Sequence, residues 1–320
     1  MNTESIPLYF RYWGKAEKDG NGYHLLPYHC LDVAAVGAAW WEEDKALRDL
    51  LVRACNIEEQ ILKSYLLFFI ALHDLGKFDV RFQLKAKDIA LSLNPIFSEA
   101  DGSQFRNFDH GRYGQYWFSH ERNSYGFNIF DDTELYHWIS AVCGHHGRGF
   151  GTGNCSSPSA DDVVIEHDRT TRAQWVEKLK ALFLEPAGIY SLYELPEPPA
   201  LLAGFCSICD WLGSNTDFFS LKGKADTSID EYFHGQRSNA LSALRASGML
   251  GEPTRKGGMD IIYPDYHPRG IQHLVNQLPV EPGLTLIEAP TGSGKTEAAI
   301  AYASRLLAHG LADTIVFALP

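Results

Sequence analysis

Apolar positions recur at helical spacing through the first two hundred residues of the chain. In residues 27–43, for example, Val33, Val36 and Trp40 stand three or four residues apart, which is typical of one face of an α-helix. The same spacing predicts further helices over residues 42–60, 61–75, 109–118, 133–146, 170–184 and 198–213. Because almost nothing here alternates as a strand would, we predict a mainly α domain over residues 1–225.

The pattern changes towards the end of the sequence. Residues 226–280 are polar, with a helical piece near 229–247, and are interpreted as a connector. Within residues 281–320 we predict a buried strand at 284–288, a helix at 295–308 and a second strand at 314–318, which is a partial α/β unit of the βαβ kind. An apolar strand that has no neighbouring strands to pair with can pair with another chain and aggregate. We therefore expect residues 281–320 to be the least stable part of the chain.

Composition narrows the class of protein. Among the 320 residues, 45% are hydrophobic and 21% are charged, as in a globular protein. The longest apolar run is too short to span a bilayer and the N-terminus does not resemble a signal peptide, so we expect a cytoplasmic protein without a membrane partner. The net charge of −12 excludes binding to nucleic acid through bulk positive charge. The six cysteines, with Cys206 and Cys209 among them, are expected to be reduced core residues.

The apolar run that begins at Leu66 ends in His73-Asp74. An imidazole and a carboxylate at the end of a buried helix need partners, because unpaired polar groups are costly inside a protein. A divalent metal is one such partner. The alternative is a purely structural helix end, in which Asp74 pairs with Lys77 and His73 binds a backbone carbonyl. The dipeptide alone leaves both interpretations open.

Other histidines at helix ends favour a metal. The candidate ligands follow one another in the order H, HD, H, HH and D, all within the predicted α-helical domain: His29, His73, Asp74, His110, His145, His146 and Asp210. This segment resembles the HD superfamily of metal-dependent phosphohydrolases, in which the ligands have this order. Shells rich in imidazole favour manganese, iron, cobalt or nickel over magnesium.

The residues within and around these motifs indicate a narrower family. The stretches 73–78 (HDLGKF), 144–147 (GHHG) and 210–214 (DWLGS) resemble the HD nuclease domain of the type I CRISPR-associated helicase–nuclease, and subtype I-E is closest. The resemblance implies an HD-domain helical fold and a site for two transition metals bridged by Asp74. It places His29, His73 and Asp210 on one metal, and the remaining three histidines, His110, His145 and His146, on the other.

Three further residues are candidates for contact with the substrate. Lys77 could neutralise the scissile phosphate in catalysis, or it could be a surface cation favoured by the dipole of the preceding helix. Arg148, in a glycine-rich loop, and Ser214, after the last ligand, are weaker candidates for binding the substrate.

A second constellation lies in residues 289–296, APTGSGKT. It fits the phosphate-loop pattern, with Ala289 in place of the first glycine, and it stands between a predicted strand and a predicted helix. Its spelling resembles that of superfamily-two helicases. ATP and magnesium would bind at Thr291, Gly292, Ser293, Gly294, Lys295 and Thr296. Upstream, residues 266–272 resemble the segment of such helicases whose glutamine, Gln272 here, recognises adenine. The alternative, equally supported by the sequence, is that these residues are simply the start of a helix after Pro268.

These resemblances imply a metal-dependent nuclease, acting as an endonuclease or exonuclease on single-stranded DNA in CRISPR antiviral interference. It would be joined to the truncated start of an ATP-dependent DNA helicase and would work with a Cascade-type effector complex. The alternatives are an HD phosphohydrolase acting on nucleotides or cyclic nucleotides, and an inactive remnant acting as a binding module. The acidic and arginine groups of a complete helicase motor have no counterpart, so we expect either a fragment or a naturally shortened chain.

Overall fold

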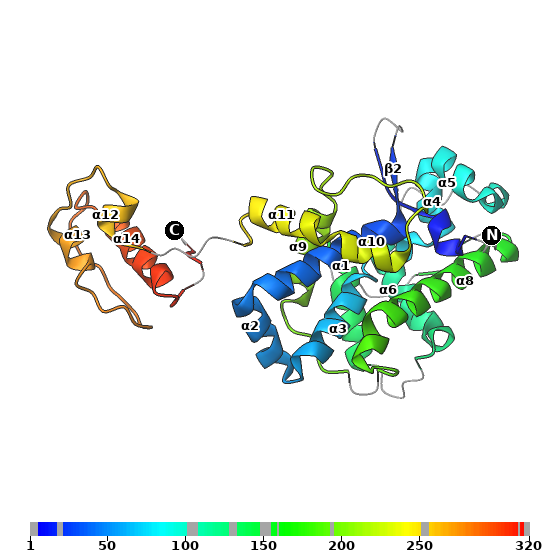
Figure 1. The fold of residues 1–320 in the computed structure, drawn as a ribbon, viewed down its shortest axis with the longest axis horizontal. Helices are drawn as coiled ribbons and strands as arrows, with labels where there is room; N and C mark the ends of the chain where they lie inside the picture. The colour runs from blue at the N-terminus through cyan, green and yellow to red at the C-terminus, as the bar shows by residue number, and fades with distance from the viewer. Residues whose placement is uncertain are drawn as a thin grey trace. The chain divides into compact units, whose positions relative to one another are not determined.

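The computed structural model describes residues 6–17, 22–100, 108–127, 133–147, 155–158, 160–192, 195–250, 256–312 and 314–316. Contacts between residues divide the chain into two compact units, Met1–Leu250 and Gly251–Pro320. The predicted helices recur in the first unit, which is mainly α, as expected (Figure 1). No helix among the described residues is both long and apolar enough to cross a membrane.

The first unit contains a two-stranded hairpin and eleven α-helices among its described residues. The strands are β1 (Trp13–Ala16) and β2 (Tyr23–Leu25). The helices are α1 (Leu26–Glu43), α2 (Lys45–Cys55), α3 (Glu59–Ile70), α4 (Val80–Gln83), α5 (Lys87–Leu93), α6 (His110–Glu121), α7 (Thr133–Cys143), α8 (Asp162–Leu179), α9 (Leu202–Gly213), α10 (Ile229–Gly235) and α11 (Arg237–Ala246). Shorter 3-10 turns include Leu8–Arg11 and Leu75–Lys77.

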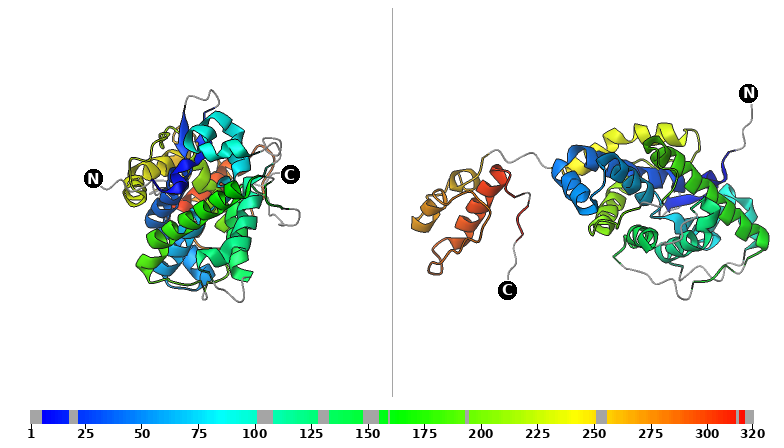
Figure 2. Two further views of the ribbon diagram at one scale, coloured as in Figure 1. Left: turned by 90° about the vertical axis from the view of Figure 1, so that its right-hand side faces the viewer. Right: turned by 90° about the horizontal axis from the view of Figure 1, so that it is seen from below.

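Helix α1 lies at the centre of this unit. It packs against α3, α9, α10 and α11, and its middle is buried all round, as Leu31, Val33 and Val36 show (Figures 1 and 2). Burying a side chain of this size contributes about 1.5–3 kcal/mol. Because α1 touches so many helices, a ligand on it can meet ligands from several of them. Helices α10 and α11, from the predicted connector, also pack on α1 in the first unit.

The helix predicted over residues 61–75 ends earlier in the structure. Helix α3 ends at Ile70, and the chain continues in tight turns. In these turns the backbone N–H of His73 donates to the backbone carbonyl of Ile70, and the backbone N–H of Lys77 donates to the backbone carbonyl of Asp74. These turns are more tightly wound than an α-helix. They bring both His73 and Asp74 to the same centre, which adjacent positions of an α-helix, about 100° apart, do less well.

The hairpin pairs β1 and β2 in antiparallel register, with Trp13 opposite Leu25 and Lys15 opposite His24, and it stands at one side of the unit (Figures 1 and 2). It is fixed to the helices through Gln83. The Gln83 carboxamide accepts from Trp13 N–H at 3.0 Å and donates to the Trp13 carbonyl at 2.9 Å. It also donates to the Lys77 carbonyl at 2.8 Å, so β1 is anchored beside the turn that carries His73 and Asp74.

The second unit contains α12 (Met259–Ile262), α13 (Gly270–Val275) and α14 (Lys295–Ala308). Its small core is made of four buried residues, Met259, Val275, Ala298 and Ala301. The predicted helix 295–308 is confirmed. The two strands of the predicted βαβ unit are not formed: neither 284–288 nor 314–316 is a strand, and 317–318 lie outside the described residues.

The absence of these strands has a physical reason. A strand in a parallel sheet needs neighbouring strands to pair with, and residues 256–312 and 314–316 contain none. The apolar side chains expected to be buried there are exposed instead: Leu284 is 100% exposed and Leu286 79%.

Candidate metal centre

Five separate segments of the first unit meet at one buried place. His29 lies on α1, His73 and Asp74 lie in the turns after α3, and Asp210 lies on α9. His110 is the first residue of α6, and His145 and His146 follow α7. The structure therefore brings together all seven candidate ligands, although they are spread over 182 positions of the sequence, from 29 to 210.

Asp74 lies between two groups of these residues. Its Oδ2 atom is 3.0 Å from His29 Nε2 and 3.3 Å from His73 Nε2. Its other oxygen, Oδ1, is 3.3 Å from His110 Nε2. The two oxygens of this one carboxylate therefore face different sets of imidazoles, which is the arrangement that a carboxylate bridging two metals requires.

The first group consists of His29, His73 and Asp210, whose potential ligand atoms all lie within 4.8 Å of one another. Asp210 Oδ1 is 3.5 Å from His29 Nε2 and 3.7 Å from His73 Nε2. All three side chains are buried, so a cation among them would be shielded from water.

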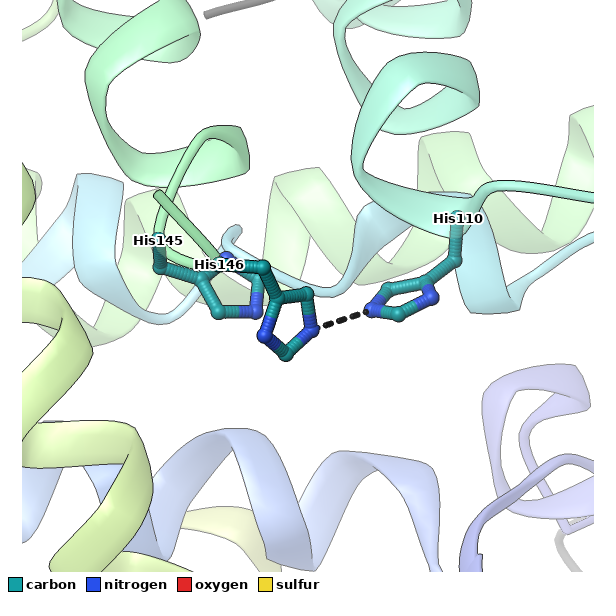
Figure 3. Close-up of side chains that lie close together, drawn as sticks. All are labelled: His110, His145 and His146. Atoms are coloured by element: carbon teal, nitrogen blue, oxygen red, sulfur yellow. Dashed lines mark hydrogen bonds between the residues drawn. The ribbon is translucent and has the colours of Figure 1, made fainter. Parts of the chain in front are cut away.

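The second group consists of His110, His145 and His146, which also lie within 4.8 Å of one another. In Figure 3 the rings of His145 and His146, from the turn after α7, point towards the ring of His110 at the start of α6. The Nε2 atoms of His110 and His146 are 3.1 Å apart. This group is more open than the first, because His146 is exposed and His110 is only partly buried.

Backbone carbonyls set the tautomers of two rings. His73 Nδ1 is 2.8 Å from the Ile70 carbonyl, and His145 Nδ1 is 2.7 Å from the Val142 carbonyl. A carbonyl oxygen only accepts hydrogen bonds, so each Nδ1 carries a hydrogen. The lone pair on Nε2, the atom that faces the centre, is then available to a metal.

Charge and burial at the site also suit a cation. Burial lowers the pKa of His29 and of His145 to about 4 and that of His110 to about 3, so these rings are neutral at neutral pH and can act as ligands. Burial opposes the charge of Asp74, but Lys77 and His73 outweigh it and hold the pKa of this carboxyl well below its ordinary value.

His73 is the exception among the buried rings. Burial would lower its pKa, but the carboxylates of Asp74 and Asp210 outweigh burial and raise the pKa of His73 to about 10. With no cation beside it this ring would carry the positive charge itself, as a proton on Nε2. A metal ion between the ring and the two carboxylates would take the place of that proton and leave His73 as a neutral ligand.

Unsatisfied polar atoms provide a direct test of whether a metal fits. Nε2 of His29, Nε2 of His73 and both oxygens of Asp74 are buried and have no hydrogen bond of ordinary geometry among the described residues. Their approaches of 3.0–3.3 Å are close but badly angled for hydrogen bonds. Asp74 Oδ2 has an ion pair with Lys77 at 2.5 Å, but within the described part of the chain the two imidazole Nε2 atoms and Asp74 Oδ1 have no hydrogen-bond partner. Leaving such atoms unpaired inside a protein is costly. Divalent metals coordinated by these atoms would remove that cost, so the donor set fits a metal-dependent site.

The candidate substrate contacts have different surroundings. Lys77 is not a surface cation: its side chain is 13% exposed, its Nζ is 2.5 Å from Asp74 Oδ2, and it donates to the Gly14 carbonyl at 3.1 Å. Ser214 Oγ donates to Asp210 Oδ1 at 3.1 Å. Arg148 lies outside the described residues.

A close backbone contact sets the distance between the two groups. A Cβ atom on Gly76 would lie 1.9 Å from the His110 carbonyl oxygen and 2.6 Å from Gly114 N. Only glycine permits the turn after Asp74 to approach α6 this closely. The role of Gly76 in placing His110 beside Asp74 was not predicted from the sequence, because it depends on a contact between two distant segments.

The predicted ATP-binding residues lie together in the second unit. The loop before α14 has positive φ angles at Gly292 and Gly294, of 80° and 84°. Gln272 is buried, accepts from Arg269 N–H at 2.8 Å and donates to the Gly294 carbonyl at 3.3 Å. Lys295 Nζ donates to the carbonyls of Ala289 and Pro290, at 2.6 and 3.0 Å. The ammonium group is thus held by the loop itself, where a phosphate would otherwise bind it.

The family model for the Cas3 HD domain matches residues 13–219, a segment that contains all seven candidate ligands. The chain belongs to the Cas3 HD domain family. The resemblance to the CRISPR-associated helicase–nuclease and the mainly α HD fold are thereby confirmed. The match ends before the phosphate loop, in agreement with an HD domain joined to the start of a helicase region.

Individual relatives extend the likeness beyond the HD domain. The chain is 41% identical to the CRISPR-associated endonuclease/helicase Cas3 of Escherichia coli (strain K12), over 97% of this chain and 38% of the relative. T. fusca Cas3-AMPPNP has a similar fold, with a TM-score of 0.66, 25% identity and coverage of 94% of this chain and 34% of that chain. A CRISPR RNA-guided surveillance complex, pre-nicking, contains a similar chain, with a TM-score of 0.60, 25% identity and coverage of 92% and 34%. The chain therefore spans 38% or less of the length of these relatives.

Proposed function

We propose that the HD domain of this chain cuts single-stranded DNA in the cytoplasm, with two transition metals at the centre around Asp74. The observation that carries the proposal is the carboxylate of Asp74, whose Oδ1 faces His110 and whose Oδ2 faces His29 and His73. One metal is assigned to His29, His73, Asp74 and Asp210, and the other to Asp74, His110, His145 and His146. When bound, such a pair supplies Lewis acidity to a phosphodiester and to a water molecule.

The residues of the chain have distinct tasks in this proposal. Buried carboxylates and neutral imidazoles hold the cations, and the backbone carbonyls of Ile70 and Val142 keep two rings in the ligating tautomer. Lys77 places a positive charge 2.5 Å from Asp74, where it neutralises the scissile phosphate as that group approaches. Ser214 orients Asp210 through its hydroxyl.

Partners and the remainder of the machinery form the second part of the proposal. The solved relative found in a CRISPR RNA-guided surveillance complex supports a Cascade-type partner for the protein that contains this HD domain. In a longer protein, a complete helicase would bind ATP and magnesium at residues 291–296, with Gln272 reading adenine. It would deliver the single strand to the metal centre.

The choice of metal gives the experiment that tests this function. We expect the purified chain to cut a labelled single-stranded oligonucleotide with manganese, cobalt or nickel, and poorly with magnesium alone, because imidazoles outnumber carboxylates at the site. Cleavage should need no ATP. Metals are added one at a time to metal-free protein, and free nucleotides and cyclic nucleotides serve as competing substrates. Strong activity in magnesium without stimulation by the other metals would contradict the ligand assignment, and preferential hydrolysis of nucleotides would contradict the choice of substrate.

A second prediction concerns the phosphate loop. We expect no sustained ATP hydrolysis by this 320-residue chain, since hydrolysis needs a positioned water and charged groups beyond the loop, and Lys295 is bonded to loop carbonyls. Steady-state ATPase with single-stranded DNA present measures this. DNA-stimulated turnover that is lost in Lys295→Ala would disprove it.

The low stability predicted for residues 281–320 can be measured by hydrogen exchange. Because Leu284 and Leu286 are exposed, we expect fast amide hydrogen exchange across 281–320, in contrast to slow exchange in α3. Exchange as slow as that of α3 would show that this segment is as stable as the core of the HD domain.

A further inference from the structure

Strand β1 runs directly beside the metal centre. A Cβ atom on Gly14 would lie 2.9 Å from Leu26 Cα and 3.2 Å from His29 Cβ, so the backbone of β1 is in contact with a candidate ligand. The Gly14 carbonyl also accepts from Lys77, the cation paired with Asp74. Because Gly14 contacts both His29 and Lys77, the next residue of β1 is also held close to the site.

That residue is Lys15. Its ammonium group donates to the Ser214 carbonyl, at the end of α9, and the Ser214 hydroxyl donates to Asp210 Oδ1. Lys15 thus approaches the centre from the side of Asp210, whereas Lys77 approaches it from the side of Asp74. Two cations of the HD domain border the candidate metal site.

The partner of Lys15 is a neutral carbonyl, and among the described residues no carboxylate lies within ion-pair distance of its ammonium group. Lys85 and Lys295 also bind carbonyls. What sets Lys15 apart is its place, because its carbonyl partner belongs to Ser214, whose hydroxyl donates to the candidate ligand Asp210. The bond from the Lys15 ammonium group to the Ser214 carbonyl is charge-assisted on the donor side only, whereas a bond to a phosphate oxygen would be ionised on both sides and would add Coulomb attraction. A phosphate oxygen would therefore compete with the neutral Ser214 carbonyl.

We infer that Lys15 binds single-stranded DNA: its ammonium group exchanges the Ser214 carbonyl for an oxygen of a phosphate that neighbours the scissile one. The inference rests on the proposed function, since it assigns a further contact of the same substrate. Lys77 and Lys15 then hold consecutive phosphates on the two sides of the metal centre. Such contacts fix the position of a strand without reading its sequence.

A structural role is the competing interpretation of Lys15. Lysine side chains often bind the last carbonyls of a helix and are favoured by its dipole. In that case Lys15 would hold Ser214, and through it Asp210, in place. The two roles differ in what a variant loses. Loss of a phosphate contact would lower the affinity for DNA and the dependence of that affinity on salt. Loss of a cap on α9 would instead weaken the hold on Asp210 and lower the metal content.

The test compares Lys15→Met, Lys15→Arg and a control, Lys45→Met. Lys45 is 76% exposed on α2 and pairs only with Asp49, so its substitution changes charge by the same amount away from the site. Binding of a labelled oligothymidylate is measured by fluorescence anisotropy over a range of salt concentrations. Cleavage kinetics with manganese and the metal content of each variant are measured alongside.

We expect Lys15→Met to raise KM about tenfold, with a smaller change in kcat, as the loss of a hydrogen bond to a charged group would do. The slope of log affinity against log salt should become shallower by about 0.7, the value for one phosphate of a single strand. Metal content should stay at the wild-type level, Lys15→Arg should restore most of the affinity, and Lys45→Met should behave as wild type.

Other outcomes overturn the inference in distinguishable ways. Loss of metal and of kcat at unchanged KM would show that Lys15 caps α9, and an unchanged salt slope would show that it touches no phosphate. If the wild-type chain binds DNA without cutting it, the proposed function fails while the slopes still decide the role of Lys15. If it neither binds nor cuts DNA, both fail.

Discussion

Replacing Asp74 with alanine is expected to abolish cleavage of single-stranded DNA and to release metal from the protein. The carboxylate faces His29 and His73 with one oxygen and His110 with the other, so its removal deprives both groups of a ligand. Two cations left without a bridging anion would also repel each other. We expect a fall in activity of at least about a thousandfold, beyond what the loss of a single hydrogen-bond donor costs.

This result must be separated from unfolding. The helical content of Asp74→Ala, measured by circular dichroism, should change little, because the helices that surround the site are held by the core around α1. Asp49→Ala, at an exposed carboxylate on α2, is the control and should keep full activity. Full nuclease activity in Asp74→Ala would contradict the assignment of two metals.

Adding one methyl group at Gly76 is expected to lower nuclease activity strongly, although less than removal of the Asp74 carboxylate does. The new Cβ atom would lie 1.9 Å from the His110 carbonyl oxygen, so α6 must move away from the turn that carries Asp74. Displacements of about 1 Å can reduce a reaction rate about a hundredfold. We expect Gly76→Ala to lower kcat/KM by about that factor with manganese, and to lower the free energy of unfolding by about 1–3 kcal/mol, as overpacking does.

The control for this substitution is Gly204→Ala on α9, the helix that carries Asp210. No atom lies within 4 Å of the Cβ position at Gly204, and replacing glycine by alanine inside a helix is favourable by about 0.5–1 kcal/mol. This variant should be as active as wild type and slightly more stable. Equal activity in Gly76→Ala and Gly204→Ala would disprove the role given to the close contact between the turn and α6.

Residue order and helical spacing predicted much of the HD domain. The seven candidate ligands could be chosen among the histidines and aspartates because their order along the chain resembles that of the HD superfamily. Taken one at a time, a position near a helix end or on a helix with an apolar face would not have distinguished them from structural residues. The spacing also predicted α14 with its observed bounds. Such signals are local, since helical hydrogen bonds join residues four positions apart.

Contacts between distant segments could not be predicted in the same way. Nothing local in the sequence indicates that Gly14 touches His29, that Gly76 touches His110, or that Lys15 reaches Ser214. The prediction of a strand at 284–288 was wrong for a related reason. The apolar residues there have the pattern of a buried strand, but a strand forms only if other strands pair with it. Residues 256–312 and 314–316 contain no such strand.

The most direct test of the two-metal centre is the metal content of the protein itself. The wild-type chain, loaded with manganese and freed of excess metal, is compared by elemental analysis with His146→Ala and Asp74→Ala. His146 belongs only to the second, more open group, whereas Asp74 faces both. We predict about two metals per chain in the wild type, about one in His146→Ala and almost none in Asp74→Ala. A wild-type chain that binds no metal, or one whose metal content is unchanged in Asp74→Ala, would contradict the account.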